Sequence, residues 1–343
     1  MASILFVVPR FHTNLFFATK ALIEAGHRVA VFAETTSRIE DHSHVAPEVF
    51  GTAPDAARLR SALAELQPDL IFARYPSKLS KAIHVAARKA RLRILSYDQR
   101  PLTQRRGLKK RLSYALEQRA WERITPVRGL DAEAPTDPAA HYLPWPIEER
   151  PVPQATYRDT AKGAVRILCV GKLAQVRKRQ DAVIDAMQSL PGGATLTLVG
   201  ATDRDISGAD EAHLARLQKA VADHPWITLQ SDVSYGDMPA LFAAHHVCVL
   251  PSVHETLGWA PIEAMAYGTI PVISEGAGSA GYITSGQNGF RVDLSDEGAL
   301  RDRLSALVGD PALRLRLSSG ARRTAQNDLS PEVFVSRVAA LLA

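Results

Sequence analysis

Short, unbroken apolar runs alternate with stretches of helical periodicity along most of this chain of 343 residues. The runs include ILFVV near the N-terminus, VRILCV after the middle of the chain and VCVL before Pro251. Strands of a parallel sheet read as solid apolar runs because helices cover both faces of such a sheet. Strands that alternate with helices indicate βαβ units. The sequence therefore predicts an α/β fold built on parallel sheets.

The alternation breaks once, in the segment LPWPIEERPVPQATYRDTAKG, which contains four prolines. Such a segment is typical of a linker. We therefore predict two Rossmann-like, doubly wound domains that face each other across a cleft, residues 1–145 and 164–329, joined by a linker at 146–163. Residues 330–343 form a last helix, with Ser330 as its N-cap and Pro331 at its first position. We expect this helix to pack back toward the N-terminal domain.

The formal net charge of +5 permits a nucleic acid, an anionic membrane surface or a phosphate-bearing ligand as partner. Much of the excess lies in residues 103–123, where seven basic and two acidic residues accompany apolar residues at helical spacing. Either this segment is an amphipathic surface helix with a solvated basic face, or it rests on anionic lipid head groups. Cys169 and Cys248 each lie inside an apolar run and read as core residues in a reducing compartment. We expect a cytoplasmic protein, with peripheral contact to the inner membrane face as the alternative that residues 103–123 raise.

The stretch VHETLGWAPIEAMAYGTIPVI, residues 253–273, holds two glutamates eight positions apart. It follows a predicted strand, so it lies where ligands bind in open α/β sheets. We predict a helix over 259–267, with Gly268 as its stop. The free N–H groups of residues 257–260, together with the helix dipole, favour a phosphate there. Glu255 precedes this helix and Glu263 lies inside it, and each carboxylate can accept two hydrogen bonds from neighbouring hydroxyls.

A second candidate element, GKLAQVRKR, follows the strand VRILCV. Lys172 and Lys178 lie six residues apart across a loop and a helix start, with Arg177 and Arg179 beside them. Cations near a helix N-terminus oppose its dipole, so a bound anion explains them. A diphosphate between Lys172, Lys178 and the helix after Glu255 is one reading, and a solvated basic loop is the other.

The motif Glu255-TLGWAPI-Glu263 (E-x7-E), followed by AMAYGTIPVI, resembles the retaining glycosyltransferases of the GT-B fold, in the GT4-like family. That family includes sucrose synthases, phosphatidylinositol mannosyltransferases and many bacterial polysaccharide enzymes. The run VGKL…RKR is similar to the family's G-R-L…K-G phosphate loop, with Lys172 in the place of the arginine. The runs LFAAHHVCVLPS and SGQNGF also match, so the resemblance covers the second domain nearly end to end.

The resemblance implies a role for each motif residue. Glu255 would contact the hydroxyls of the donor sugar, and Glu263 the ribose of the nucleotide. Lys172 and Lys178 would bind the diphosphate and stabilise the charge that develops as it leaves. No metal and no cofactor is implied beyond a UDP- or GDP-linked sugar as co-substrate, whose own phosphate acts as the base. The implied donor-binding residues are Lys172, Arg177, Lys178, Glu255, Thr256, Leu257, Gly258, Trp259 and Glu263.

The sequence departs from the family pattern at three places. Leu257 stands where a phenylalanine is usual, and Tyr282 where a glutamate is usual. Many members carry a histidine on the acceptor side after the strand that matches RILSY, where this chain has Tyr97-Asp98-Gln99-Arg100. We take Asp98 as a candidate catalytic residue there, with Arg100 and His12 as further acceptor-side candidates. For His12, a purely structural role is the alternative.

These observations favour a metal-independent, retaining hexosyltransferase that moves a sugar from a nucleotide-diphosphate donor to a saccharide or lipid-linked acceptor, in bacterial glycan or glycolipid synthesis. A nucleotide-sugar epimerase on the same fold and a catalytically degenerate nucleotide-binding partner protein are alternatives. A nicotinamide oxidoreductase predicts G-x-G-x-x-G after the first strand, and PRFHTNLF contains no glycine. A nucleic-acid-binding protein predicts a wide basic stripe with interleaved aromatic residues, whereas the basic residues cluster in one segment and one loop.

Overall fold

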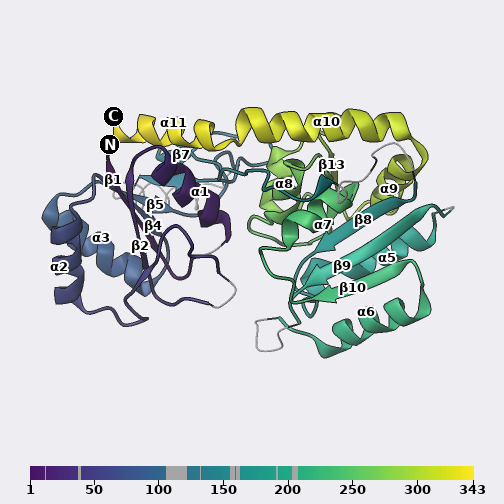
Figure 1. Ribbon diagram of the computed structural model, residues 1–343, viewed down its shortest axis with the longest axis horizontal. Coiled ribbons are helices and arrows are strands. Elements are labelled where there is room, and N and C mark those ends of the chain that lie inside the picture. The colour runs from purple at the N-terminus through teal and green to yellow at the C-terminus, as the bar shows by residue number, and fades with distance from the viewer. Residues whose placement is uncertain are drawn as a thin grey trace. The chain divides into compact units, whose positions relative to one another are not determined.

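The computed structural model describes residues 1–11, 13–37, 40–105, 122–131, 133–154, 159, 163–190, 192–202 and 208–343. His12 and most of the basic segment 103–123, namely residues 106–121, lie outside this part of the chain. By its contacts the chain divides into two compact units (Figure 1). The first unit comprises Met1–Pro146 with Leu329–Ala343, and the second comprises Ile147–Asp328.

The first unit is built on a parallel sheet whose described strands run in the order β3-β2-β1-β4-β5-β6-β7 (Figure 1). Its strands are β1 (Ser3–Val8), β2 (Arg28–Ala33), β3 (Glu48–Val49), β4 (Leu70–Arg74), β5 (Ile94–Tyr97), β6 (Arg123–Thr125) and β7 (Ala140–Tyr142). Its described helices are α1 (Thr13–Glu24), α2 (Ala56–Leu66), α3 (Lys78–Ala90) and α11 (Pro331–Leu342).

The second unit is built on a parallel sheet in the order β10-β9-β8-β11-β12-β13. Its strands are β8 (Val165–Val170), β9 (Ala194–Gly200), β10 (Ile227–Ser231), β11 (Val247–Leu250), β12 (Ile270–Ser274) and β13 (Phe290–Val292). Its described helices are α5 (Gln180–Gln188), α6 (Glu211–Asp223), α7 (Met238–Ala244), α8 (Ala260–Met265), α9 (Ala299–Gly309) and α10 (Pro311–Asp328), with short 3-10 turns at Val176–Lys178 and Gly278–Tyr282.

Both sheets reverse their strand order beside the first strand of the unit. In the first unit β1 pairs in parallel with both β2 and β4, and in the second β8 pairs in parallel with both β9 and β11. Ligands of doubly wound sheets bind at the carboxyl ends of the strands at this reversal. The loops that follow β8 and β11 carry the two sequence motifs, so the fold brings both motifs to the reversal of the second sheet.

The strands form the core of each unit because helices pack on both faces of each sheet. All four residues of β11 are buried, as are Leu70, Ile71, Phe72 and Ala73 of β4. Cys169 and Cys248 are free and buried, and burial raises the pKa of the Cys169 thiol to about 12. The prediction that both cysteines are core residues is confirmed. Among the described residues, none of the helices combines the length and the apolar character that a membrane crossing requires.

The C-terminal helix α11 belongs to the first unit and packs against α1. Its N-cap is Ser330, whose Oγ accepts a hydrogen bond from the Val333 amide at 3.4 Å. The buried Phe334 ring lies 6.1 Å from the ring of Trp145, which is completely buried. The last residues of the chain therefore complete the core of its first unit.

Gly200, the last residue of β9, gives a stability test of the second sheet. A Cβ at this position would lie 1.8 Å from the carbonyl oxygen of Gly171, in the loop that carries Lys172. We expect Gly200→Ala to lower the free energy of unfolding by about 1 to 3 kcal/mol, because the backbone must shift to admit the methyl group. Gly309→Ala is the matched control, since a Cβ there has no atom within 4 Å. Urea denaturation measures both, and equal stabilities would contradict this account of the packing.

Candidate functional site

The loop that carries Glu255 is fixed by backbone hydrogen bonds to two neighbouring segments. The Glu255 amide donates to the Gly276 carbonyl at 3.0 Å, and the Gly278 amide donates to the Glu255 carbonyl at 3.0 Å. The Val253 amide donates to the carbonyl of Arg177 at 3.0 Å. The Glu255 loop, the loop after β12 and the basic turn after β8 therefore hold one another in place.

The carboxylate of Glu255 is the centre of a small ion cluster. Its Oε2 accepts hydrogen bonds from the ammonium of Lys178 and, at 3.1 Å, from Nη1 of Arg177. The same Nη1 donates to the carbonyl of His254 at 2.8 Å. Burial raises the pKa of the Glu255 carboxyl, but the adjacent charges of Lys178 and Arg177 outweigh burial and lower the pKa below its usual value. Glu255 is therefore ionised at neutral pH.

The structure thus brings together three of the predicted donor-site residues, Arg177, Lys178 and Glu255. The sequence suggested separate ligands for Lys178 and Glu255, whereas the structure joins them in an ion pair. Lys172 lies apart from this cluster: it is exposed, and its side chain has no ion pair within the described part of the chain. Its ammonium is therefore available to a ligand at the same edge of the sheet.

Gly258 is required by the shape of the turn before α8. It has a φ of +73°, and a Cβ at this position would lie 2.3 Å from Cδ2 of Leu250 and 2.9 Å from Cγ of Glu255. The helix begins at Ala260 and ends at Met265, so it is shorter than the predicted helix over 259–267. Residues 266–268 form a turn that ends at Gly268, with φ of +67°. The predicted stop residue is right, although the helix itself is short.

The side chains between Glu255 and α8 differ in exposure. Thr256 is exposed, whereas Leu257 and Trp259 are buried. The Trp259 ring packs edge-on against Tyr282 with 5.4 Å between the ring centroids. The amides of Leu257, Gly258 and Trp259 have no backbone acceptor among the described residues. Leu257 and Trp259 therefore offer a ligand their backbone amides, while their side chains belong to the core.

Glu263 on α8 is held by a tyrosine from the loop after β10. The Tyr235 hydroxyl donates to Oε1 of Glu263 at 2.9 Å. The Arg150 guanidinium lies over the Tyr235 ring at 4.5 Å and donates from Nη2 to the Tyr235 carbonyl at 2.6 Å. Burial raises the pKa of Glu263 to about 7, although the hydrogen bond from Tyr235 and the charge of Arg150 lower it. Glu263 is therefore poised between its two charge states near neutral pH.

Tyr235 and Arg150 were not found from the sequence. Tyr235 lies four residues after the end of β10, and a tyrosine at the carboxyl end of a strand was a usable signal. Arg150 lies in the proline-rich segment that was read as a linker, and nothing in the local pattern separates it from a solvated arginine. Its role depends on a contact with a residue 85 positions away.

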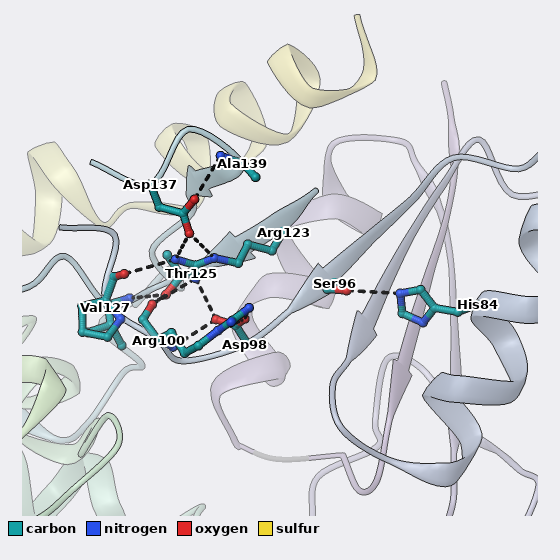
Figure 2. A network of polar contacts seen from close by, with 10 residues as sticks. His84, Ser96, Asp98, Arg100, Arg123, Thr125, Val127, Asp137 and Ala139 are labelled. Atoms are coloured by element: carbon teal, nitrogen blue, oxygen red, sulfur yellow. Dashed lines mark hydrogen bonds and ion pairs between the residues drawn. The ribbon is translucent and has the colours of Figure 1, made fainter. Parts of the chain in front are cut away.

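Asp98 lies in the first unit, directly after β5, in a buried polar network (Figure 2). Its Oδ1 accepts a hydrogen bond from Nη1 of Arg123 at 2.7 Å, and its Oδ2 accepts one from Nε of Arg100 at 2.8 Å. Arg123 is 2% exposed and also donates from Nε to Oδ2 of Asp137 at 2.8 Å. Two carboxylates therefore flank one buried guanidinium.

This network corrects one expectation and qualifies another. From the sequence, Arg123 was counted with the basic segment 103–123. The structure shows instead that it is a buried residue of β6 whose guanidinium pairs with Asp98. Asp98 is itself buried, and its contacts orient Arg100, whose side chain is 47% exposed. Its geometry is that of a residue that positions Arg100, and a catalytic role for Asp98 stays a prediction. The His12 prediction falls outside the described residues.

Comparison with known proteins gives a family match for the second unit. Residues 158–324 match the family model described as "Glycosyl transferases group 1". The lipopolysaccharide core biosynthesis glycosyltransferase LpsE of Rhizobium meliloti (strain 1021) is 29% identical over 185 residues, 54% of this chain and 52% of that protein. A D-inositol 3-phosphate glycosyltransferase of Pseudarthrobacter chlorophenolicus is 32% identical over 169 residues, 48% of this chain and 39% of that protein. The chain thus spans about half or less of the length of these curated relatives.

Solved structures match both units. Anabaena Alr3699/HepE, in a crystal structure with UDP, aligns with a TM-score of 0.76 at 17% identity and covers 99% of both chains. Sucrose-phosphate synthase from Thermosynechococcus elongatus aligns with a TM-score of 0.71 at 18% identity, over 99% of this chain and 98% of that one. The chain has the GT-B fold, two parallel-sheet α/β units, so the predicted fold class is confirmed.

Asp98→Asn tests the buried network of the first unit. Removing this charge takes away one of the two carboxylates that flank the buried Arg123, and it also takes away the carboxylate that pairs with Arg100. We expect a loss of about 3 kcal/mol in the free energy of unfolding, as is usual when one member of a buried ion pair is removed. Asp131→Asn is the control, because Asp131 pairs with the exposed Arg105 and its loss should be much smaller. Chemical denaturation that gave equal losses would contradict the buried role of Asp98.

Glu263 predicts a specific pH dependence of stability. Its pKa is about 7 in the folded chain against 4.5 as the reference, so the folded state binds this proton more tightly than the unfolded state. The Glu263 carboxyl therefore makes its full contribution to the free energy of unfolding below pH 4.5. This contribution is lost as the pH rises to about 7. We expect wild type to lose about 2 to 3 kcal/mol between pH 5 and pH 8 relative to Glu263→Gln.

The measurement is urea denaturation of both proteins at the two pH values. Glu149→Gln serves as the control, because Glu149 forms a partly exposed ion pair with Arg322 at 3.1 Å. This variant should follow the wild-type profile. If Glu263→Gln follows it as well, the raised pKa of Glu263 is wrong.

Proposed function

We propose that this chain is a retaining, metal-independent glycosyltransferase that transfers a hexose from a UDP- or GDP-linked donor to a saccharide or lipid-linked acceptor. The observation that carries the proposal is the cluster of Arg177, Lys178 and Glu255 at the strand reversal of the second sheet. It places two cations and one ionised carboxylate where doubly wound sheets bind nucleotides. The match of residues 158–324 to "Glycosyl transferases group 1" supports the same reaction class.

The second unit binds the donor in this proposal. Lys172, Arg177 and Lys178 hold the diphosphate, and the amides of Leu257, Gly258 and Trp259 donate to its oxygens. Glu263 accepts hydrogen bonds from the ribose hydroxyls, a role that suits a carboxylate with two acceptor oxygens. Tyr235 orients Glu263 through the hydroxyl contact of 2.9 Å. The crystal structures of Anabaena Alr3699/HepE with UDP and with UDP-glucose support a nucleotide-sugar as donor.

The transfer breaks the bond between the anomeric carbon and the donor phosphate oxygen and forms a bond to the acceptor oxygen. The acceptor hydroxyl gives its proton to the departing phosphate on the same face of the sugar, so the anomeric configuration is retained. Lys172 and Lys178 stabilise the negative charge that develops on the diphosphate. Glu255, held by Lys178 and Arg177, accepts hydrogen bonds from the sugar hydroxyls and fixes the orientation of the ring.

The first unit binds the acceptor in this proposal. Arg100, held by Asp98, presents a half-exposed guanidinium at the carboxyl edge of its sheet, where it can contact polar or anionic groups of an acceptor. The name of the similar Rhizobium meliloti protein, which places it in lipopolysaccharide core biosynthesis, supports a bacterial glycan or glycolipid as the product. Residues 103–123, apart from the buried Arg123, remain a candidate contact with the inner membrane face, where lipid-linked acceptors reside.

Nucleotide binding and sugar transfer test the proposal together. Of UDP, GDP, ADP and CMP, we expect UDP or GDP to stabilise the protein by about 2.7 kcal/mol at 100 times its dissociation constant. Lys178→Gln should weaken that binding at least tenfold, because a charge-assisted contact to phosphate is lost. Lys219→Gln, which removes an exposed lysine of α6 paired with Asp223, should leave it unchanged.

Calorimetric titration gives the affinities, and NMR coupling constants of the product give its anomeric configuration. Absence of binding by every nucleotide, or equal effects of the two lysine variants, would overturn the donor site. A product of inverted configuration would overturn the retaining mechanism and leave the donor site intact.

A further inference from the structure

Helix α8, which carries Glu263, is too short to be stable by itself. It has six residues, Ala260–Met265, whereas isolated helices of fewer than about 12 residues are marginal in water. The position of α8 therefore depends on contacts with the segments around it. The direction of the Glu263 side chain depends on the same contacts, because its backbone belongs to this helix.

Helix α10 holds the turn that follows α8. Arg322 of α10 donates from Nη1 to the Ala266 carbonyl at 3.3 Å and from Nη2 to the Tyr267 carbonyl at 3.1 Å. The Ser318 hydroxyl donates to the Gly268 carbonyl at 2.6 Å. Carbonyls at the end of a helix lack partners within the helix, so these three bonds supply what the short helix leaves open. They also fix the main chain of Tyr267, whose side chain is buried.

The Tyr267 hydroxyl holds the main chain of Arg150, which lies 117 residues earlier in the sequence. It accepts a hydrogen bond from the Arg150 amide at 2.9 Å and donates one to the Arg150 carbonyl at 3.3 Å. Arg150 belongs to the proline-rich segment at the start of the second unit, and no described helix or strand includes it. Its position relative to α8 is therefore set by this hydroxyl, since a shift of the segment would break both bonds.

The Arg150 side chain holds Tyr235 at two points. Its Nη2 donates to the Tyr235 carbonyl at 2.6 Å, and its guanidinium lies over the Tyr235 ring at 4.5 Å. The ring is thereby held with its hydroxyl on Oε1 of Glu263, at 2.9 Å. Glu263, Tyr235, Arg150 and Tyr267 therefore form a closed ring of contacts that begins on α8 and ends in the turn after it.

The charge of Arg150 acts on Glu263 as well. Burial raises the pKa of the Glu263 carboxyl to about 7, although the hydrogen bond from Tyr235 and the charge of Arg150 lower it. The neighbouring titratable groups, among the residues that the structure describes, are Tyr235, Tyr267 and Cys248 of β11. Burial raises the pKa of Tyr235 and that of Cys248, and the charge of Glu263 adds to both effects. Arg150 is therefore the cation that favours the ionised form of Glu263.

We propose that Arg150 is a positioning residue for the donor, which holds the Glu263 carboxylate in place for the ribose hydroxyls through the ring of Tyr235. This inference rests on the proposed function, which places the ribose on Glu263. Tyr235 occupies Oε1, whereas Oε2 has no hydrogen bond within the described part of the chain, and the side chain is partly exposed. A carboxylate with one oxygen anchored and the other open presents a fixed acceptor to a ligand. Arg150 acts only through its neighbours and does not touch the donor.

The test is calorimetric titration of the full chain with UDP and GDP, each compared with its 2′-deoxy analogue. We expect wild type to bind the ribonucleotide about tenfold more tightly than the analogue, because the analogue lacks a hydrogen bond to a charged group. Arg150→Gln should reduce this preference to less than about threefold, because Glu263 is no longer held in place. A role of Arg150 in folding alone would lower both affinities in proportion and leave the preference unchanged.

Tyr235→Phe is the second variant, and it guards against a folding defect in Arg150→Gln. It keeps the ring that lies under the Arg150 guanidinium and the carbonyl that accepts from it, and it removes the hydroxyl that contacts Glu263. We expect the same loss of preference. The double variant should lose no more than either single variant, because both residues act through one contact.

A second measurement needs no ligand. Carbon NMR of the labelled Glu263 carboxyl, assigned with Glu263→Gln, gives its pKa in wild type and in Arg150→Gln. The pKa should rise in the variant, because a charge that lowers it is gone. Arg301→Gln is the matched control for both measurements, since Arg301 pairs with the adjacent Asp302 on the exposed face of α9. It should change neither the pKa nor the preference for the ribonucleotide.

The outcomes separate this inference from the proposed function. A wild-type preference for the ribonucleotide that persists in both Arg150→Gln and Tyr235→Phe would overturn the inference and leave the donor site intact. An unchanged pKa of Glu263 in Arg150→Gln would also overturn the inference alone. Equal binding of the ribonucleotide and its analogue by wild type would overturn the ribose contact of Glu263 and the inference with it, and absence of any nucleotide binding would overturn both as well.

Discussion

The ion pair between Lys178 and Glu255 joins two loops that are 77 residues apart in the sequence, and the candidate donor site depends on it. Each loop follows a strand beside the reversal of the second sheet, so the sheet determines where the loops begin. The ion pair and the backbone bond from Val253 to Arg177 then determine how they face each other. Because these groups are already oriented, a diphosphate would meet fixed charges with little reorganisation, which is the condition for strong electrostatic stabilisation.

Each unit contains a polar cluster, which is buried in the first unit and half-buried in the second, and the charges of the two clusters are compensated differently. In the first unit Arg123 is flanked by Asp98 and Asp137, so its charge is compensated by direct contacts. In the second unit Glu263 has a hydroxyl donor and a more distant guanidinium, and its pKa rises to about 7. A fully compensated charge fixes structure, whereas a partly compensated carboxylate retains affinity for hydrogen-bond donors. This difference favours a binding role for Glu263 and a positioning role for Asp98.

The fold was predictable because parallel strands carry a local signal, the solid apolar run, and the site loops follow those runs. The E-x7-E motif and the basic turn were found for the same reason. The length of α8 was overestimated. Ala266 and Tyr267 continue its helical pattern in the sequence, but they lie in the turn that ends at Gly268. Arg123 was misread because its neighbours in the sequence suggested a helix. Its contacts with Asp98, after β5, and with Asp137, before β7, identify it as a buried residue of a strand. Tyr235 was missed because its place after β10 is only a general signal, whereas its role comes from a contact with Glu263, 28 residues away.

The outer face of α3 illustrates why charge must be read together with burial. The sequence drew attention to residues 103–123, where the charge is dense, and passed over α3, where basic residues are spread over several turns. Once the buried residues of α3 are known, its four basic residues, Lys78, Lys81, Arg88 and Lys89, are seen to lie on one side of the helix. Within the first unit, Oε1 of Glu34 accepts a hydrogen bond from the Leu79 amide at 2.9 Å, so a carboxylate from another loop already lies at the start of this helix.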